Sequence, residues 1–342
     1  MPRIDSLATS LPAHRCDQSD VRNEMARVCR GDRAMERLLP VFDRIGVDTR
    51  YFVRPLEWYS EGQPFETRNA VYATSALELS EKAARACLDR SGTSPDTIDH
   101  IYFVTTTGLM TPSLDARLAS RLGLRPDVRR LPLFGLGCAA GAGALVRAAD
   151  TLRAYPTHRA LVISVELCSL VFSPVARTAT DLVGAALFGD GAAAVVVAGD
   201  ETGGEGPAIR ATRTHLFQEA PDLMGWNFTA DGMRLVLSRD VPKFVATGVA
   251  PVVNKFLDAQ GLSLPDLSHL ILHPGGAKVM ATYRSVFGLD DVALNNAAVY
   301  YHQQKAPQQA MDTRLILAEK FPKSKYYNDT IANLVCAQLL HL

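Results

Sequence analysis

Residues 134–145 read FGLGCAAGAGAL, a glycine-rich turn that leads into an alanine-rich segment. Residues 129–133 before it have the pattern of a strand, so the turn is predicted to join a strand to a helix. Cys138 then lies at the helix N-terminus, where unpaired backbone N–H groups and the helix dipole stabilise a thiolate. We therefore expect a lowered thiol pKa and a nucleophilic sulfur. A small buried cysteine at the start of a Gly-Ala helix is the alternative interpretation.

The glycines around Cys138 do not complete the fingerprint of a dinucleotide site or of a P-loop, so a phosphate-binding turn is a weak interpretation. The chain has six cysteines, none in a Cys-x-x-Cys pair and none with histidines at metal-ligand spacing. Disulfides and metal sites, zinc included, are therefore not expected. Each of the other cysteines is most simply a small buried apolar residue.

The composition excludes several classes of function. Apolar residues make up 47% of the 342 residues, which is enough to bury a large core. Lysine plus arginine and aspartate plus glutamate number 36 each, so no overall field draws the chain to nucleic acid or to an acidic membrane surface. The N-terminus is charged where a signal peptide would be apolar, and no apolar run approaches a membrane span. We expect a cytoplasmic protein with no nucleic-acid partner and no membrane span.

One pattern occurs twice along the chain and indicates the fold class. In the first copy, a helix over 75–90 ends at a Ser-Gly pair, and a buried strand follows at 101–104. In the second copy, a helix ends at 257–261 and a strand follows at 270–272. Both helix ends carry the residues Leu-Asp-x-x-Gly. We interpret this as an internal duplication in an α/β layered fold; chance similarity between two helix–turn–strand units is the alternative.

The boundary between the two halves is predicted at residues 199–206. This stretch is acidic and rich in glycine, and both features disfavour a continuous helix or strand. We therefore expect an N-terminal half at 1–204, which contains Cys138, and a C-terminal half at 205–342.

His273 is the candidate base. It ends the apolar strand of the second copy, and Pro274, Gly275 and Gly276 come directly after it. Such a turn ends strand pairing and allows close backbone approach. A core histidine bonded to a neighbouring carbonyl is the alternative. Because Cys138 and His273 lie in different copies, a pseudo-two-fold arrangement would bring both into one central site.

Several further segments occur in a fixed order along the chain. With the Cys138 turn, they make the sequence similar to one family over about residues 1–290; they are Thr106–Gly108, Pro112–Arg117, Ser164–Ser169, Leu187–Ala193, Asp231–Met233 and Asp240–Pro242. The sequence resembles the chalcone synthase-like, or type III polyketide synthase, family, bacterial branch. The His-Pro-Gly-Gly turn favours this branch over the carrier-protein-dependent ketoacyl synthases of the same fold, which remain the second interpretation.

The resemblance implies a fold and a reaction. The fold is thiolase-like, with αβαβα layers built from two duplicated halves. Cys138 would take an acyl group from an acyl-CoA, and malonyl-CoA would be decarboxylated and condensed onto it. His273 would hold Cys138 as a thiolate and would donate a hydrogen bond to the thioester oxygen. No cofactor is implied beyond the CoA thioester substrates, and a homodimer is the expected assembly.

The resemblance also implies which residues bind the substrate. Phe188 matches the gatekeeping phenylalanine between the CoA tunnel and the reaction cavity, and Gly275 and Gly276 belong to the histidine turn. Leu235 takes the position of a second gate residue, and Val171 that of a cavity-lining threonine. The pocket is thus more aliphatic than that of a plant chalcone synthase, and burial of about 0.8 kcal/mol per methylene favours a long alkyl chain. A fatty acyl starter and an alkylpyrone or alkylresorcinol product are expected.

The resemblance ends near residue 294. The family has an asparagine roughly thirty residues after the histidine and a glycine-rich loop near the C-terminus, whereas the interval here contains Tyr301–Pro307 and no asparagine. Lysines replace arginines in this tail, which indicates a foreign C-terminus from about residue 295 and an impaired enzyme. The segment around Asn328 is distantly similar to the missing asparagine motif if an insertion precedes it. A non-catalytic remnant that binds CoA or dimerises with an intact homologue is a third interpretation.

Overall fold

A five-stranded mixed sheet forms the centre of the computed structural model, which describes residues 1–171, 178–267, 270–273 and 275–289. The strand order is β1–β7–β6–β4–β5, with β4 parallel to β5 and β6, and β7 antiparallel to β1 and β6. The bounds of these strands are Arg3–Ser10 for β1, His100–Val104 for β4, Arg129–Leu133 for β5, Arg159–Leu167 for β6 and Asp190–Ala198 for β7. The strands predicted at 101–104 and 129–133 are therefore confirmed.

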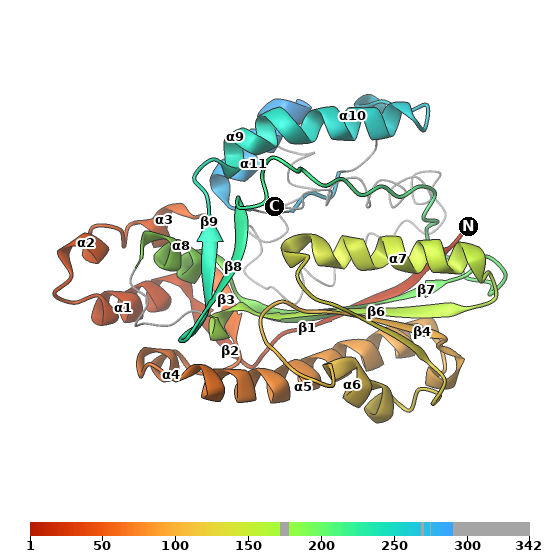
Figure 1. Cartoon of the computed structure of the whole chain (residues 1–342), viewed down its shortest axis with the longest axis horizontal. Coiled ribbons are helices and arrows are strands. Elements are labelled where there is room, and N and C mark those ends of the chain that lie inside the picture. The colour runs from red at the N-terminus through yellow and green to blue at the C-terminus, as the bar shows by residue number, and fades with distance from the viewer. Residues whose placement is uncertain (172–177, 268–269, 274, 290–342) are drawn as a thin grey trace.

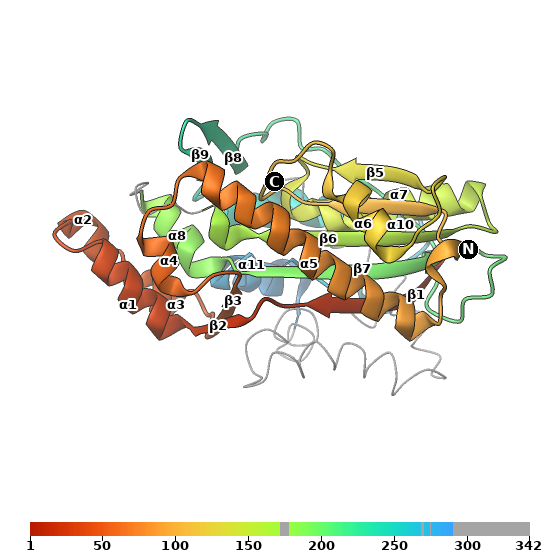
Figure 2. The same cartoon turned by 90° about the horizontal axis from the view of Figure 1, so that it is seen from below.

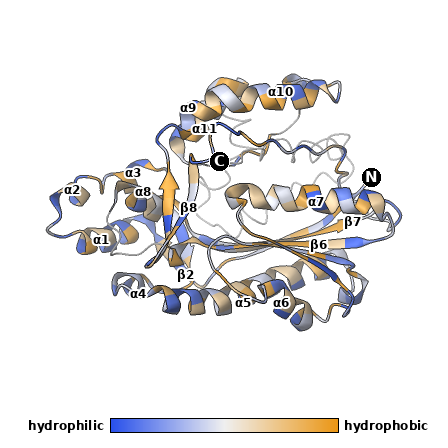
Figure 3. Ribbon diagram, viewed as in Figure 1, coloured by the Kyte–Doolittle hydropathy of each residue, from blue (hydrophilic) through white to orange (hydrophobic). Residues whose placement is uncertain are grey.

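Helices cover both faces of this sheet (Figure 1). The long helix α5 (Phe65–Ser91) and α6 (Leu114–Leu122) lie on one face, and α7 (Ala140–Ala154) lies on the other. Strand β4 is buried on both sides: Ile101 and Phe103 pack with α5 and α6, and Tyr102 and Val104 pack with α7. Figure 3 shows the central strands as mainly hydrophobic. A strand whose apolar side chains are buried on both faces of the sheet is typical of a layered α/β protein.

Small residues explain how close α7 lies to the sheet. Ala140, Ala144 and Ala148 are spaced four residues apart and are fully buried against the sheet. Side chains at this spacing share one face of a helix, and a methyl group allows that face to approach the strands closely. The alanine-rich sequence after Cys138 therefore specifies a tightly packed helix.

A smaller unit closes one end of the sheet. Strands β2 (His14–Asp17) and β3 (Thr49–Phe52) form a two-stranded ribbon, and five short helices pack around it. These helices are α1 (Gln18–Val28), α2 (Arg33–Glu36), α3 (Val41–Arg44), α4 (Leu56–Ser60) and α8 (Ala179–Leu187). Their apolar residues form a separate cluster around Phe42 and Leu182, so this unit has a core of its own.

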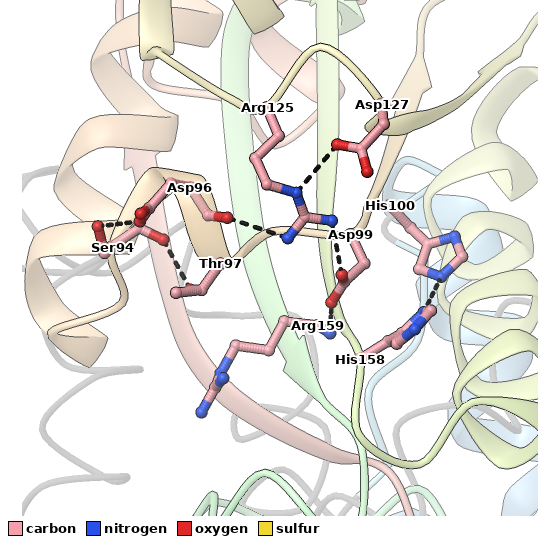
Figure 4. A network of polar contacts seen from close by, with 9 residues as sticks. All are labelled: Ser94, Asp96, Thr97, Asp99, His100, Arg125, Asp127, His158 and Arg159. Carbon is pink, nitrogen blue, oxygen red and sulfur yellow. Dashed lines mark hydrogen bonds and ion pairs between the residues drawn. The ribbon is translucent and has the colours of Figure 1, made fainter.

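A polar network fixes the start of β4 (Figure 4). The Asp99 carboxylate accepts hydrogen bonds from the Arg159 backbone N–H at 2.8 Å and from Arg125 Nη2 at 2.9 Å, and so ties β4 to β6. The next residue, His100, is buried, and its Nε2 lies 3.0 Å from His158 Nδ1. Buried polar groups need such partners, because an unpaired one loses its hydration without compensation.

The described part of the second half packs around its own core. The hairpin of β8 (Met224–Thr229) and β9 (Gly232–Leu237) is followed by α9 (Val241–Phe244), one π-helical turn at Val245–Val249, α10 (Ala250–Asp258) and α11 (Ala277–Phe287). Apolar side chains of α9, α10 and α11 form one cluster, which lies on the α7 side of the sheet in Figure 1. No helix of the described residues has the length and apolar character needed to cross a membrane.

The α/β class with thiolase-like layers is confirmed, and the two sequence copies can now be compared. We call residues 88–104 the first repeat and residues 257–273 the second repeat. The first repeat follows the predicted order of helix end, turn and strand β4. The strand predicted at 270–272 was wrong: no strand is assigned there, although Leu270 and Leu272 are buried. A strand needs a neighbour for its hydrogen bonds, and none of the described strands pairs with this segment.

Candidate active site

Cys138 lies where β5 passes into α7. Two glycines with positive φ, Gly135 at 87° and Gly137 at 51°, turn the chain sharply there, a conformation that glycine adopts at little cost. One 3₁₀ turn, Gly137–Ala139, then leads into α7. The predicted strand–turn–helix geometry is confirmed, and Cys138 occupies the first turn of the helical segment.

The electrostatic environment of Cys138 differs from the expectation. The residue keeps contact with solvent, but the protein around the thiol desolvates its charged form, and the nearby Glu166 carboxyl adds to the effect. Together they raise the pKa of Cys138 to about 11. The helix N-terminus alone therefore does not produce a thiolate in this arrangement. A cation or a base must approach the sulfur to generate one.

Glu166 is the partly buried acid near this thiol. It lies near the end of β6, and its carboxylate accepts hydrogen bonds from Thr106 N at 3.1 Å, Thr106 Oγ1 at 3.0 Å and Thr107 Oγ1 at 2.7 Å. Burial raises its pKa to about 7 despite these bonds. We singled out this glutamate only as part of a family-like segment. A lone acid within the apolar strand at 159–167 was the signal that could have identified it.

A second cluster of polar side chains follows Cys168 and consists of Ser169, Asp190 and Tyr59. Cys168 interacts electrostatically with Cys138, and burial raises the pKa of its thiol. The next residue, Ser169, donates to the buried Asp190 at 2.5 Å and lies 2.7 Å from the Tyr59 hydroxyl. Burial raises the pKa of Asp190 to about 6. These groups lie at the end of the sheet where Cys138 is found.

His273 comes directly after the buried segment at 270–272. Its backbone carbonyl accepts a hydrogen bond from Gly275 N at 2.9 Å, which closes the turn. Burial lowers the pKa of the imidazole, so its neutral form is favoured. Within the described residues, no hydrogen bond joins His273 to Cys138. The described residues therefore do not show Cys138 and His273 as a hydrogen-bonded pair.

The glycines of the histidine turn lie close to apolar side chains. A Cβ atom at Gly275 would lie 3.1 Å from Val279 Cγ1, tighter than ordinary contact. Gly276 has φ of 92° and caps α11, and a Cβ there would lie 3.7 Å from Leu187 Cδ1. The turn therefore lies beside the end of α8, next to Phe188.

The three predicted pocket residues lie on neighbouring elements. Phe188 is half-buried at the C-terminal cap of α8, and its carbonyl accepts a hydrogen bond from Arg50 Nη1 at 2.9 Å. Leu235 lies on β9, which packs against α8, and it is 9% exposed. Val171 is buried, and its carbonyl accepts a hydrogen bond from Arg68 Nη1 at 2.9 Å. The tail from residue 295, with Asn328, lies outside the described residues.

Comparison with known proteins gives consistent matches. The family described as chalcone and stilbene synthases, N-terminal domain, matches residues 3–201. A 1,3,6,8-tetrahydroxynaphthalene synthase of Streptomyces peucetius subsp. caesius is 41% identical over 300 residues, 86% of this chain and 79% of that protein. A Bacillus subtilis (strain 168) protein named after chalcone synthase is 39% identical over 310 residues, 87% of this chain and 85% of that protein.

One solved structure extends the similarity to three dimensions. It is the crystal structure of the 1,3,6,8-tetrahydroxynaphthalene synthase of Streptomyces coelicolor A3(2), described as a bacterial type III polyketide synthase. The TM-score is 0.81 with 27% sequence identity, and the match covers 99% of this chain and 90% of the other. The similarity therefore includes the fold as well as the sequence.

Proposed function

The chain belongs to the chalcone and stilbene synthase family and is a type III polyketide synthase, and we propose that it condenses an acyl-CoA starter with malonyl-CoA on Cys138. The observation that carries this proposal is the position of Cys138 in the glycine turn between β5 and α7, near the partly buried Glu166. Cys138 is exposed to solvent and is therefore accessible to a substrate.

The proposed reaction has two steps. In loading, the Cys138 sulfur bonds to the acyl carbon, the bond from that carbon to the CoA sulfur breaks, and CoA leaves as its thiol. In extension, malonyl-CoA loses CO₂ and becomes an enolate. The enolate carbon attacks the thioester carbonyl and releases the Cys138 sulfur, so the acyl chain grows by two carbons on CoA.

His273 supports both steps in this proposal. Because burial favours the neutral imidazole, His273 has a free nitrogen to take the thiol proton during loading. In extension, its N–H donates a hydrogen bond to the thioester oxygen as enolate charge develops. The raised pKa of Cys138 makes such a base necessary near neutral pH.

We propose a medium or long fatty acyl starter and an alkylpyrone or alkylresorcinol product. Leu235 and Val171 are both aliphatic and buried, which supports an alkyl chain beside them. A malonyl-primed naphthalene synthase is the second candidate. It is favoured by the 41% identity to a protein with that name.

A homodimer is the proposed assembly. Strand β5 is the outer strand of the sheet next to β4, and its residues 129–132 are exposed. Leu131 is 42% exposed and Phe134 is 49% exposed at its end. Exposed large apolar side chains such as these two favour a contact with a second copy that covers them.

We also propose that the tail from residue 295 limits the condensation step. Loading relies on residues before 290, whereas the family's second oxyanion donor belongs to the part of the chain that the tail replaces. Loss of one such donor lowers the rate of the step it supports on the order of 10²–10³-fold.

The test is incubation of the purified chain with malonyl-CoA and a panel of acyl-CoA starters, without carrier protein, followed by mass analysis. Products that contain the starter alkyl chain support the proposal. A naphthalene product from malonyl-CoA alone would select the second candidate. Absence of both acyl-Cys138 and any product would contradict the proposed function and favour a non-catalytic remnant.

A further inference from the structure

Arg68 is a buried arginine near the start of α5, and it is 4% exposed. Among the described residues, its hydrogen bonds all end on main-chain carbonyls. Burial removes the hydration of the guanidinium, so these carbonyls are what satisfies its N–H groups. Their positions in the chain therefore show which segments this side chain holds together.

One end of the guanidinium holds the segment that follows β6. Arg68 Nη1 donates to the carbonyl of Leu170 at 2.8 Å and to that of Val171 at 2.9 Å. Its Nε donates to the carbonyl of Gln63, just before α5, at 3.1 Å. The backbone that carries Val171, one of the predicted pocket residues, is thus fixed to the start of α5.

The other end of the guanidinium holds the β8–β9 hairpin. Arg68 Nη2 donates at 2.5 Å to the carbonyl of Asp231, which lies in the turn between the two strands. This turn lies beside the start of α5 in both Figure 1 and Figure 2. The Asp231 carboxylate is bonded within the hairpin, to Arg234 Nη2 at 3.0 Å. Leu235, the predicted second gate residue, follows on β9, so the same arginine also fixes the hairpin that carries it.

The hairpin turn packs closely against this part of α5. Gly232 has φ of 111°, and a Cβ atom there would lie 2.7 Å from Phe65 Cδ2 and 3.1 Å from Arg68 Nη2. The first of these distances is too short for any side chain without movement of the turn or of the ring. Glycine therefore allows the turn to reach the Arg68 guanidinium, which itself lies 5.8 Å from the centre of the Phe65 ring.

The shape of the guanidinium makes these contacts a single clamp. Its N–H groups point in fixed directions from one rigid plane, so two segments bonded to its two ends are held in one relative arrangement. The segment with Val171 and the hairpin with Leu235 belong to distant parts of the chain. Their relative position therefore depends on Arg68.

We propose that Arg68 is a positioning residue, which holds the Val171 segment and the Leu235 hairpin in one arrangement and thereby sharpens the choice between starter acyl groups. This inference rests on the proposed function, because it takes both side chains as walls of the reaction cavity. A wall that can move accommodates a poorly fitting acyl group at a lower cost, so discrimination between starters falls when the clamp is lost.

Substitutions on both sides of the clamp test the inference on the full chain. Arg68→Met removes the donors but keeps an unbranched apolar side chain, and Arg68→Lys keeps the charge without the planar fork. Gly232→Ala leaves Arg68 in place and pushes the turn away from it. Gly225→Ala, on the same hairpin, is the matched control, because a Cβ atom there meets no described atom within 4 Å.

The measurement is a competition for loading. Each protein receives equal, limiting concentrations of two acyl-CoAs, namely the best starter and the poorest starter that the parent chain loads. The two acyl-Cys138 species are quantified by intact-protein mass, and their ratio gives the relative kcat/KM of the two starters. Loss of folded protein lowers both species equally and leaves the ratio unchanged, so the ratio separates positioning from stability.

We expect Arg68→Met to lower this ratio by about 10-fold, the lower end of the discrimination that a hydrophobic wall supplies. Arg68→Lys should lower it as well, since one ammonium cannot replace the fork. Gly232→Ala should lower the ratio, and the double variant Arg68→Met/Gly232→Ala should fall no further than Arg68→Met alone, because both act on the same contact. Gly225→Ala should keep the parent ratio.

The outcomes separate this inference from the proposed function. If Arg68→Met and Gly232→Ala both keep the parent ratio, the inference is wrong while the proposed function stands. If the Arg68 variants do not fold, equal ratios for Gly232→Ala and Gly225→Ala still contradict the inference. If no acyl-CoA loads Cys138 of the parent chain, the proposed function is contradicted and the inference falls with it.

Discussion

The first and second repeats share a turn but continue differently. In the first repeat, the Thr93 N–H donates to the Leu88 carbonyl at 3.0 Å; in the second, the Leu262 N–H donates to the Leu257 carbonyl, also at 3.0 Å. Each helix thus ends with the same backbone hydrogen bond, in which the donor lies five residues after the acceptor. A 3₁₀ turn follows in both repeats. The helix end and its turn are therefore encoded by local residues alone.

Beyond this turn, the course of the chain depends on neighbouring strands. The first repeat continues into β4, which pairs with β5 and β6. Thr106 follows β4 and donates a hydrogen bond to Glu166 of β6, which lies near Cys138. The second repeat continues to His273 without a described partner strand. The nucleophile is thus held by a regular sheet and a helix, whereas the candidate base is held by a turn. We expect substitutions on the two sides to affect different steps.

The largest effect is expected for Cys138→Ala, which removes the sulfur held by the first half. Covalent loading from acyl-CoA should disappear, because alanine has no nucleophile. Cys87→Ala and Cys168→Ala should still load, and intact-protein mass measures all three. Persistent acylation of the Cys138→Ala protein would falsify the assignment.

His273→Ala tests the other side of the comparison. Loss of the base and of the oxyanion donor should reduce malonyl-CoA decarboxylation on the order of 10²–10³-fold. His273→Gln, which keeps a donor but not a base, should retain more of the decarboxylation than of the loading rate. Release of ¹⁴CO₂ from labelled malonyl-CoA at the parent rate in His273→Ala would mean that this histidine is structural.

The tail extends the comparison to residues after the second repeat. Replacement of the residues from about 295 by the C-terminus of an intact homologue should leave loading unchanged and raise condensation by about 10²-fold, the scale of one oxyanion donor. Product formation by mass and loading by intact-protein mass are measured on the native chain, the chimera and Asn328→Ala. Equal condensation by native chain and chimera would contradict impairment. Loss of that activity in Asn328→Ala would assign the donor to Asn328.

Sequence reasoning succeeded where the information is local. Glycines with positive φ specify the turn at Cys138, and buried alanines specify α7. It failed where partners come from distant residues. The raised pKa of Cys138 comes first from burial and then from the Glu166 carboxyl, which lies on β6, a strand paired with β4. Met25 and Phe188 line one apolar pocket although they are more than a hundred residues apart in the chain, and no local pattern joins the two.

The start of the first repeat's strand should make stability depend on pH. Burial, with the neighbouring His158 and Arg129, lowers the pKa of His100 to about 4 from its usual 6.5. The unfolded chain therefore binds a proton more readily than the folded chain, and stability contributed by neutral His100 is lost as pH falls from about 6.5 to about 4. His100→Gln should flatten this part of the profile, as measured by urea unfolding across that range. An unchanged difference between pH 7 and pH 4 would exclude His100 as the cause.

The smallest effects are expected at the shared turn itself. Gly92 and Gly261 end the two helices with φ of 62° and 68°, and a Cβ atom at either would meet no atom within 4 Å. Alanine there is strained only by its backbone, so Gly92→Ala and Gly261→Ala should each lower the free energy of unfolding by about 1 kcal/mol. Urea unfolding of the full chain measures both, with Asp89→Ala and Asp258→Ala as nearby exposed controls. Equal losses would mean that the two turns are energetically equivalent copies. A loss at Gly92 alone would mean that the second repeat opens before the rest of the chain unfolds. The two turns would then have the same shape, but only the first would contribute to the free energy of global unfolding.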